Sequence, residues 1–137
     1  MKKALFDTNL YVGWFNEGLH EALLLGPGLV RYLSSVVQME LRVGAATRSS
    51  RRLLDQLVRA HKASERLVTP STSVFDEAGL VIRALRMAGR EVRQASLVND
   101  VLIALTARTL GATVYTADGM DFAAIRAVRD FSLEVVG

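Results

Sequence analysis

The stretch Leu5-Phe6-Asp7-Thr8-Asn9 decides the fold of this chain. The apolar run from Ala4 to Phe6 indicates a short buried strand over residues 2–6, and Asp7 ends it. A carboxylate, a hydroxyl and an amide therefore stand together at the carboxyl end of the first expected strand. Other acidic residues, far away in the sequence, are candidates to join them. They are Glu40, Asp100, Asp118 and Asp121.

The composition is that of one compact domain, residues 1–137. Half of the residues are hydrophobic (50%) and 23% are charged, which is enough apolar surface for a sizeable core. No apolar run approaches the roughly 18 residues of a membrane span, and the basic start of the chain does not lead into a signal-peptide core. We expect a protein with no membrane association.

The absence of cysteine excludes disulfides, zinc–thiolate sites and thiol catalysis, and it is consistent with a reducing cytoplasm. His20 and His61 are the only histidines, so a histidine-rich metal site is excluded as well. A metal in this protein would be a hard cation bound by oxygen.

Most of the basic residues are arginines, which bind phosphate through two parallel hydrogen bonds and stack on bases. The chain carries 17 Lys and Arg against 14 Asp and Glu, a net charge of +3. The arginines form two clusters, which are either solvated helix faces or a rim that binds phosphates. The clusters are Arg48, Arg51, Arg52 and Arg59, and Arg83, Arg86, Arg90 and Arg93.

Short apolar stretches alternate with amphipathic ones along the whole chain, which predicts an α/β sandwich with a mainly parallel sheet. Ligands of such sheets bind at the carboxyl ends of the strands, where the polar residues after each strand should collect. The expected strands are 2–6, 29–33, 66–69, 113–115 and 133–136, and the expected helices are 10–15, 36–46, 49–63, 74–87, 97–110 and 122–128.

Asp7 and Glu40 each have an ordinary explanation. An Asp-Thr-Asn cluster after a strand usually caps the next helix. Glu40 lies on an apolar helix face, where an unpaired charge is costly and needs an arginine, a proton or a cation. A salt bridge to Arg42 or to a distant arginine, or a less buried helix, would satisfy it equally well. The helical neighbours of Glu40 are Val36, Val37, Val43 and Gly44.

Asp100 is expected near the start of the apolar helix 97–110, where the helix dipole stabilises an acid in the first turn and Asn99 is a candidate cap. Asp118 precedes a glycine, as in many turns, and Asp121 is a candidate cap for the last helix. Capping and turns explain each acid alone. They do not readily explain four such sites together, all at strand ends or on apolar helix faces.

Four stretches of the chain occur in a characteristic order. They are Leu5-Phe6-Asp7-Thr8-Asn9, Ser34-Ser35-Val36-Val37-Gln38-Met39-Glu40-Leu41, Asn99 to Ala107, and Gly111 to Phe122. These stretches resemble the motifs of the PIN-domain family and, within it, of the VapC-type toxins of bacterial and archaeal toxin–antitoxin pairs. The likeness covers nearly the whole chain. The residues before Asp100, Arg93 to Val98, depart from it, because many relatives have a small lead-in with Gly or Pro there.

The resemblance implies a Rossmann-like three-layer α/β/α sandwich and a metal-dependent endoribonuclease of the VapBC type. It assigns a Mg²⁺ or Mn²⁺ site and catalysis to Asp7, Glu40, Asp100 and Asp118, with Asp121 as a further ligand or an orienting neighbour, and support from Thr8, Asn9 and Thr116. The implied partners are an RNA substrate, a cognate antitoxin and a second copy in a homodimer.

The implied chemistry suits these residues. Cations held by carboxylates lower the pKa of a bound water and neutralise phosphoryl oxygens, while several acids without a cation repel one another. In this hypothesis Asp7, Asp100 and Asp118 hold the metal, and Glu40 holds or deprotonates the water.

Three other readings remain open. A non-catalytic PIN-like domain that binds RNA or serves as a scaffold would have lost some of its acids. A phospho-accepting receiver domain would need a lysine late in the chain, but none follows Lys62. An aspartate-based phosphatase usually has Asp-x-Asp at its first strand, where this chain has Asp7-Thr8-Asn9.

Overall fold

The computed structural model describes residues 1–137, and its strands and helices alternate along the chain as the sequence predicts. The elements are β1 (Lys2–Phe6), α1 (Thr8–Glu17), α2 (Glu21–Leu25), β2 (Leu29–Ser34), α3 (Ser35–Gly44), α4 (Arg48–Ala63), β3 (Leu67–Val68), α5 (Thr72–Met87), α6 (Ala95–Leu110), β4 (Thr113–Thr116), α7 (Met120–Val128) and β5 (Ser132–Val135).

The five strands form one sheet in the order β3-β2-β1-β4-β5. Every neighbouring pair is parallel, so the predicted mainly parallel sheet is wholly parallel. The strand order reverses direction between β1 and β4. A crevice opens at the carboxyl ends of the strands at such a switch point, and ligands of open α/β sheets bind there. The first strand of the chain therefore lies beside the place where a ligand is expected.

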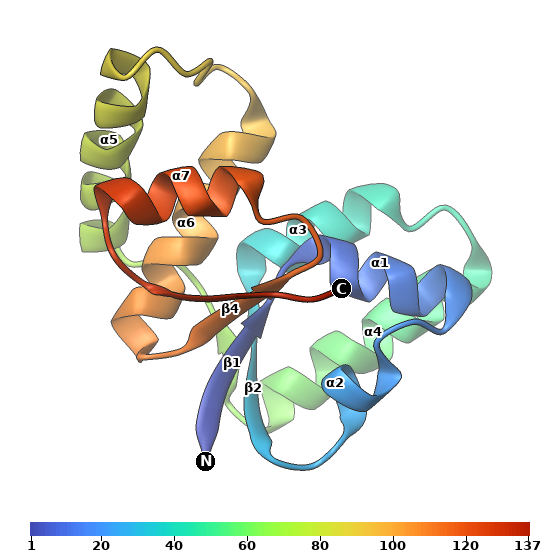
Figure 1. Cartoon of the computed structure of the whole chain (residues 1–137). Coiled ribbons are helices and arrows are strands. Elements are labelled where there is room, and N and C mark those ends of the chain that lie inside the picture. The colour runs from blue at the N-terminus through green and yellow to red at the C-terminus, as the bar shows by residue number, and fades with distance from the viewer.

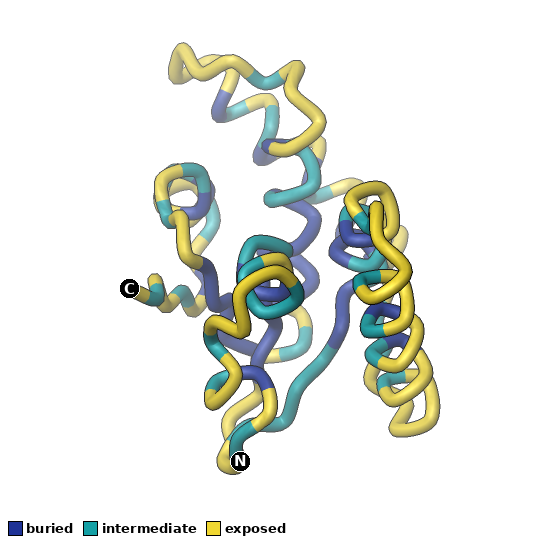
Figure 2. The backbone as a smooth tube through the Cα atoms, turned by 90° about the vertical axis from the view of Figure 1, so that its right-hand side faces the viewer, coloured by how far each residue is buried: buried dark blue, intermediate teal, exposed yellow.

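The helices cover the sheet in two groups (Figure 1). Helices α1, α3 and α4 contact one another, and so do α5, α6 and α7. The two groups meet where α3 contacts α6. Figure 2 shows the consequence for burial, with the buried segments in the interior and exposed residues on the outer helix faces. The predicted α/β sandwich is confirmed.

The core is a single cluster of 29 buried hydrophobic residues. Helix α6 contributes most, because it is buried almost all round, as its apolar sequence predicts. Fully burying one aliphatic or aromatic side chain contributes roughly 1.5–3 kcal/mol. The core thus holds α6 against the sheet, which fixes the position of every polar side chain on α6.

Local sequence signals set several helix ends. Gly111 ends α6 in the left-handed region at φ 69°, as expected for a glycine C-cap. The side chains of Ser34 and Ser71 accept hydrogen bonds at the starts of α3 and α5. Thr47 and Ser50 form a reciprocal capping box at the start of α4.

The structure differs from the sequence expectations in one unexpected helix and in the bounds of several others. Helix α1 is two residues longer at each end than expected, and α5 and α7 each begin two residues before the expected start. The short helix α2 was not expected. It follows a left-handed His20 and has no side-chain cap, so nothing in its sequence marks its start. Helix α3 ends at Gly44, two residues before the expected end. Helix α6 begins at Ala95, two residues before the expected start, and Gln94 precedes it without a side-chain cap. No helix has the length and apolar character needed to cross a membrane.

Candidate acidic active site

Asp7 lies at the switch point of the sheet. Its backbone N–H donates to Tyr115 O over 2.8 Å, which continues the pairing of β1 with β4 by one residue. Its carboxylate Oδ1 accepts from the N–H of Thr8 at 2.8 Å and so caps α1. The capping role is confirmed, but it uses only one carboxylate oxygen. The residue is 8% exposed, which makes Asp7 the most buried acid of the chain.

Thr116 links Asp7 to the end of β4. Its hydroxyl Oγ1 lies 2.8 Å from Asp7 Oδ2 and 3.0 Å from Asp118 O, and it accepts from Asp118 N at 3.1 Å. Asn9 Nδ2 donates to the same hydroxyl at 3.3 Å, and Asn9 Oδ1 accepts from Ala117 N at 3.2 Å. Thr116 is fully buried. The Thr116 hydroxyl and the Asn9 amide thus tie the end of β4 to the end of β1.

Glu40 reaches the same edge from α3. Its Oε1 accepts from the Thr8 hydroxyl at 2.6 Å, and its Oε2 accepts from Asn99 Nδ2 at 3.4 Å. The expected alternative of a salt bridge to Arg42 is wrong, because Arg42 Nη1 pairs with Asp55 at 2.8 Å instead. Glu40 is therefore held by two neutral donors.

The apolar face assigned to Glu40 is only partly buried. Val36 and Val37, one turn before it, are in the core, whereas Val43 and Gly44, one turn after it, are exposed. Glu40 itself is half-buried at the edge of that face. This position keeps its carboxylate close to the sheet edge and within reach of solvent.

Asp100 lies in the second turn of α6, since the helix begins at Ala95. The expectations of a first-turn acid and of Asn99 as a cap are therefore wrong; Asn99 instead contacts Glu40. Burial and, after it, repulsion from four further carboxylates together raise the pKa of Asp100 to about 8. These are Asp7, Glu40, Asp121 and Asp118.

The pKa of Asp7 is also raised, mainly by burial and to a lesser degree by Glu40 and Asp118. Hydrogen bonds from Thr116 and from the N–H of Thr8 oppose this effect. Two of the predicted acids therefore resist ionisation for the same two reasons, a poorly hydrated position and like charges nearby. Binding a cation would relieve both.

Asp118 and Asp121 stand at the start of α7. Asp118 is exposed, and its Oδ1 accepts from the N–H of Met120 at 3.3 Å, in keeping with the expected turn. The residue at the N-cap of α7 is Gly119, so the expected capping role of Asp121 is wrong. Asp121 lies in the first turn of the helix, and its Oδ1 accepts from Arg90 Nη2 at 2.6 Å.

All five predicted site residues thus occupy one edge of the sheet, although they come from separate parts of the chain. Their side chains as they stand include no group of three or more that is arranged to hold a metal ion. That they bind a metal stays a prediction. Apart from Asp121, none of the five takes part in an ion pair of the chain.

Sequence reasoning missed two contacts at this edge. Asn99 was considered only as a cap, yet its amide donates to Glu40, 59 residues away in the sequence. Arg90 was noted only as a member of an arginine cluster, yet it pairs with Asp121. The position of Asn99 directly before Asp100 was a signal for the first contact. No local pattern indicates the second.

The sequence matches the model of the PIN domain over residues 4–128. The chain belongs to the PIN domain family. The match spans every acid described above, and it excludes the receiver-domain and phosphatase readings. No curated protein matches the sequence of this PIN domain.

Several solved structures with the same fold come from toxin–antitoxin systems. VapBC2 from Rickettsia felis, bound to a promoter DNA fragment, contains a chain that is 22% identical, with a TM-score of 0.73 over 98% of this PIN domain and 99% of that chain. VapBC-1 from nontypeable Haemophilus influenzae contains a chain that is 21% identical, with a TM-score of 0.70 over 97% of both chains. VapBC-5 from Mycobacterium tuberculosis contains a chain that is 24% identical, with a TM-score of 0.67 over 99% of this PIN domain and 100% of that chain. At these identities the similarity establishes the fold.

Proposed function

We propose that this PIN domain is an endoribonuclease that depends on Mg²⁺ or Mn²⁺ and serves as the toxin of a VapBC-like toxin–antitoxin pair. The observation that carries the proposal is the state of Asp100. Its pKa is raised to about 8 by burial and by four other carboxylates, which means that five acids lie near one another at one edge of the sheet, and that Asp100 is poorly hydrated. Such an arrangement is costly for a purely structural site and suits one that binds cations.

The donor set is all oxygen, which is the chemistry that Mg²⁺ and Mn²⁺ prefer. Asp7, Asp100 and Asp118 would hold the metal, and Glu40 would hold or deprotonate the water. When bound, the cation would lower the pKa of a coordinated water and neutralise the phosphate. The two donors to Asp7, Thr8 N–H and Thr116 Oγ1, fix the orientation of its carboxylate.

Glu40 is the best candidate for the general base. It is held by Thr8 and Asn99, which are neutral, and it has no cationic partner to keep it from accepting a proton. We assign it the proton that the attacking water loses. A base must be oriented as well as close to the proton that it removes, and the two donors, from α1 and α6, provide that orientation.

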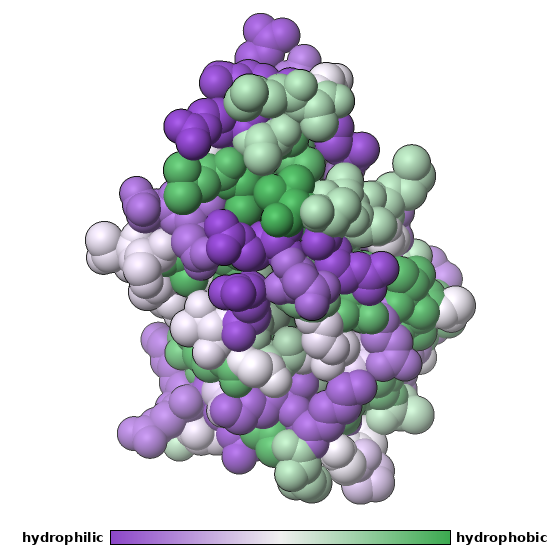
Figure 3. Space-filling model, turned by 60° about the vertical axis from the view of Figure 1, so that its left-hand side comes forward, coloured by the Kyte–Doolittle hydropathy of each residue, from purple (hydrophilic) through white to green (hydrophobic).

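The partners follow the same proposal. RNA would lie along the carboxyl edge of the sheet, with exposed arginines near its phosphates. A cognate antitoxin would cover the site, since the VapBC structures with this fold are complexes of that kind. A homodimer would use exposed apolar side chains. Helix α5 carries Phe75, Leu80 and Met87, and Figure 3 shows hydrophobic residues gathered above a hydrophilic band on one face of the molecule.

One observation favours a second candidate, a non-catalytic domain that binds RNA. No three acidic side chains are arranged to hold a metal ion. Under this alternative the acids would be caps and hydrogen-bond acceptors, as Asp7 and Asp118 partly are. The two candidates agree on RNA binding and differ in metal binding and cleavage, so one set of measurements separates them.

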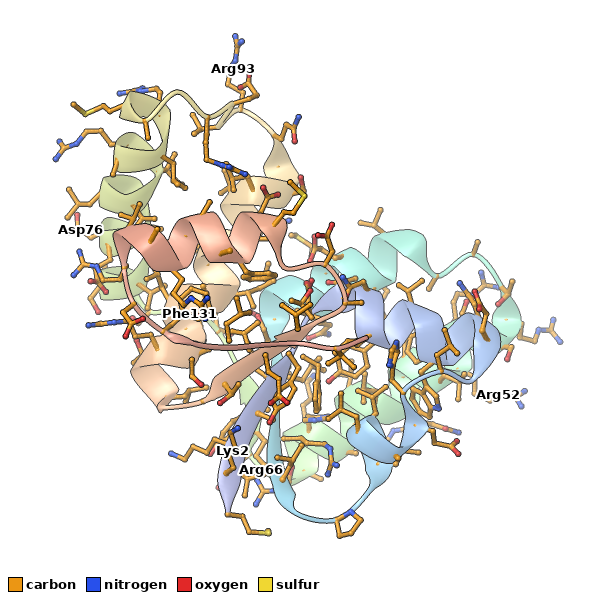
Figure 4. All side chains as sticks on the ribbon, in the orientation of Figure 1. Lys2, Arg52, Arg66, Asp76, Arg93 and Phe131 are labelled. Carbon is orange, nitrogen blue, oxygen red and sulfur yellow. The ribbon has the colours of Figure 1, made fainter.

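The deciding experiment measures Mn²⁺ and Mg²⁺ binding by calorimetry and cleavage of a mixed RNA pool, with EDTA as the control for metal removal. The variants are Asp7→Asn and a matched control, Asp76→Asn. Asp76 is an exposed acid on α5, and Figure 4 shows it at the outer side of that helix. We expect Asp7→Asn to lose both metal binding and cleavage while its circular dichroism is unchanged, and Asp76→Asn to retain both.

A folded wild-type protein that neither binds metal nor cuts RNA would support the non-catalytic alternative. The toxin role has its own test. Expression in a bacterial host should arrest growth, and expression of Asp7→Asn should not. Growth arrest by Asp7→Asn as well would show that the arrest has another cause.

A further inference from the structure

Arg90 is the only basic side chain that forms an ion pair with an acid of the site. Its Nη2 lies 2.6 Å from Asp121 Oδ1. Asp121 in turn lies in the first turn of α7, three residues after Asp118. The guanidinium of Arg90 therefore stands at the rim of the acidic site, on the side where α7 begins.

The backbone fixes the position of Arg90. Helix α5 ends at Met87, and Gly89, directly after the C-cap Ala88, has φ 91°, a left-handed conformation that favours glycine. The N–H of Gly89 donates to Arg86 O at 3.0 Å, and the N–H of Arg90 donates to Leu85 O at 3.1 Å. This pair of bonds is the Schellman motif. The backbone of Arg90 is thus held to the end of α5 by a hydrogen bond.

We propose that Arg90 binds a phosphate of the RNA beside the acidic site, and that Asp121 positions Arg90 instead of holding the metal. The inference rests on the proposed nuclease function and names a substrate contact of that site. A guanidinium has five N–H donors, and the bond to Asp121 occupies one nitrogen of Arg90. The remaining donors suit a phosphate, which arginine binds through two parallel bonds.

The accessibility of the pair agrees with this role. The side chains of Arg90 and Asp121 are 38% and 41% exposed, so a substrate can reach them. The bond also separates Asp121 from the other acids. To serve a metal, its Oδ1 would have to leave a charged partner, whereas Asp7, Glu40, Asp100 and Asp118 have none.

The same connection between α5 and α6 supplies a matched control. Arg93 pairs with Glu91, two residues away, at 3.2 Å, and its side chain is 89% exposed. Figure 4 shows Arg93 at the tip of this connection, pointing away from the rest of the molecule. Substituting either arginine by alanine removes one positive charge and leaves one carboxylate unpaired. Only the loss of Arg90 should affect the site.

The first test measures binding of a labelled single-stranded RNA of mixed sequence by fluorescence anisotropy in EDTA, over a range of salt concentrations. Each phosphate contact contributes about 0.7 to the slope of log K against log salt for single strands. We expect Arg90→Ala to lower that slope by about this amount. Arg93→Ala should keep the wild-type slope, and Arg90→Lys should keep most of it.

The second test separates Asp121 from the metal ligands. We expect Asp121→Asn to bind Mn²⁺ with the wild-type affinity in calorimetry and to weaken RNA binding as Arg90→Ala does. The double variant, Arg90→Ala with Asp121→Asn, should bind RNA no more weakly than either single variant, because both changes remove the same contact. Gly89→Ala, which strains the helix end without crowding any neighbour, should weaken RNA binding in the same way.

The outcomes distinguish this inference from the proposed function. If the wild type cuts RNA and Arg90→Ala binds RNA with an unchanged slope, the nuclease stands and Arg90 is only a surface ion pair. If Asp121→Asn loses Mn²⁺ binding, Asp121 is a metal ligand and the inference is wrong. If the wild type binds RNA through Arg90 but cuts none, the nuclease function fails and the Arg90 contact remains. A wild type that binds no RNA would overturn both.

Discussion

Thr116 Oγ1 donates a hydrogen bond to Asp7 Oδ2 over 2.8 Å, although 109 residues separate the two in the sequence. The bond is buried, and it joins the ends of the two strands between which the order of the sheet reverses. It also lowers the pKa of Asp7 and so opposes the effect of burial. The Thr116 hydroxyl therefore holds the ends of β1 and β4 together and also favours the charged form of Asp7.

Thr116→Val keeps the shape of the side chain and removes the hydroxyl. We expect the free energy of unfolding to fall by about 1–3 kcal/mol, since a buried carboxylate oxygen loses its donor. The pKa of Asp7 should rise further and metal binding should weaken. Urea denaturation and Mn²⁺ calorimetry measure the two effects. Thr116→Ser, which keeps the hydroxyl, is the control, and equal losses in both variants would contradict the role of the hydrogen bond.

Metal binding should strengthen as the pH rises to about 8. Burial, followed by the nearby carboxylates, raises the pKa of Asp100 to about 8, and a cation needs the charged form. Protons therefore compete with the metal below that pH. Calorimetry with Mn²⁺ from about pH 6 to about pH 8 tests this, with affinity increasing throughout the range. An affinity that is constant over this range would show that Asp100 is not a ligand.

The same carboxyl makes the protein without divalent cations less stable as the pH rises. An unfolded aspartate has a pKa of about 3.9, so the raised value in the folded state stabilises the protein fully below about pH 4. This contribution is lost as the pH increases through about 8. Asp100→Asn cannot ionise, so in EDTA its Tm should exceed that of the wild type at about pH 9 and approach it near pH 4. A wild-type advantage at high pH would refute this account.

Asn99→Ala should slow RNA cleavage without unfolding the protein. It removes one of the two donors that hold Glu40, and partners that orient an active-site ligand or base typically contribute about 10–100-fold to activity. RNA affinity in EDTA should not change. Asn16→Ala, at an exposed position on α1, is the matched control. An unchanged turnover in Asn99→Ala would mean that Thr8 alone orients Glu40.

Thr47→Ala should lower stability and leave cleavage unchanged. Thr47 caps α4 through Ser50 N at 3.0 Å, and the loss of such a cap costs about 1 kcal/mol. Helix α4 contributes none of the five acids of the candidate site, so activity per folded molecule should be that of the wild type. Ser49→Ala, in the first turn of the same helix, is the control for stability. A drop in activity per folded molecule would indicate that α4 affects the site.

The sequence predicted the strands, most helices and the shared location of the acids, because these depend on local signals. An Asp or Ser at the end of a strand and a glycine at the end of a helix are short-range patterns, and the structure has them as caps at Asp7, Ser34 and Gly111. Helix α2 escaped prediction because it has only five residues and no side-chain cap. The early start of α6 was not predicted because Gln94, the residue before it, makes no side-chain cap.

The hydrogen bonds within the site could not be predicted in the same way. The contact of Asn99 with Glu40 depends on how α3 packs against α6, and that of Arg90 with Asp121 depends on where the end of α5 meets the start of α7. Both join residues that are far apart in the chain. A pattern within one element says which face is apolar, but it does not say which polar side chain of another element will face it.

The central position of β1 has a consequence for the moment at which the protein gains its activity. Strand β1 is made first, yet one of its two neighbours, β4, is not synthesised until residue 113 has been added. Asp100, Asp118 and Asp121 also come late. While a ribosome is still translating the earlier part of the message, Asp7 has no Thr116 to bind and the acidic edge does not exist. An RNA-cutting activity located there would begin only after the ribosome that makes it has added Thr116, Asp118 and Asp121.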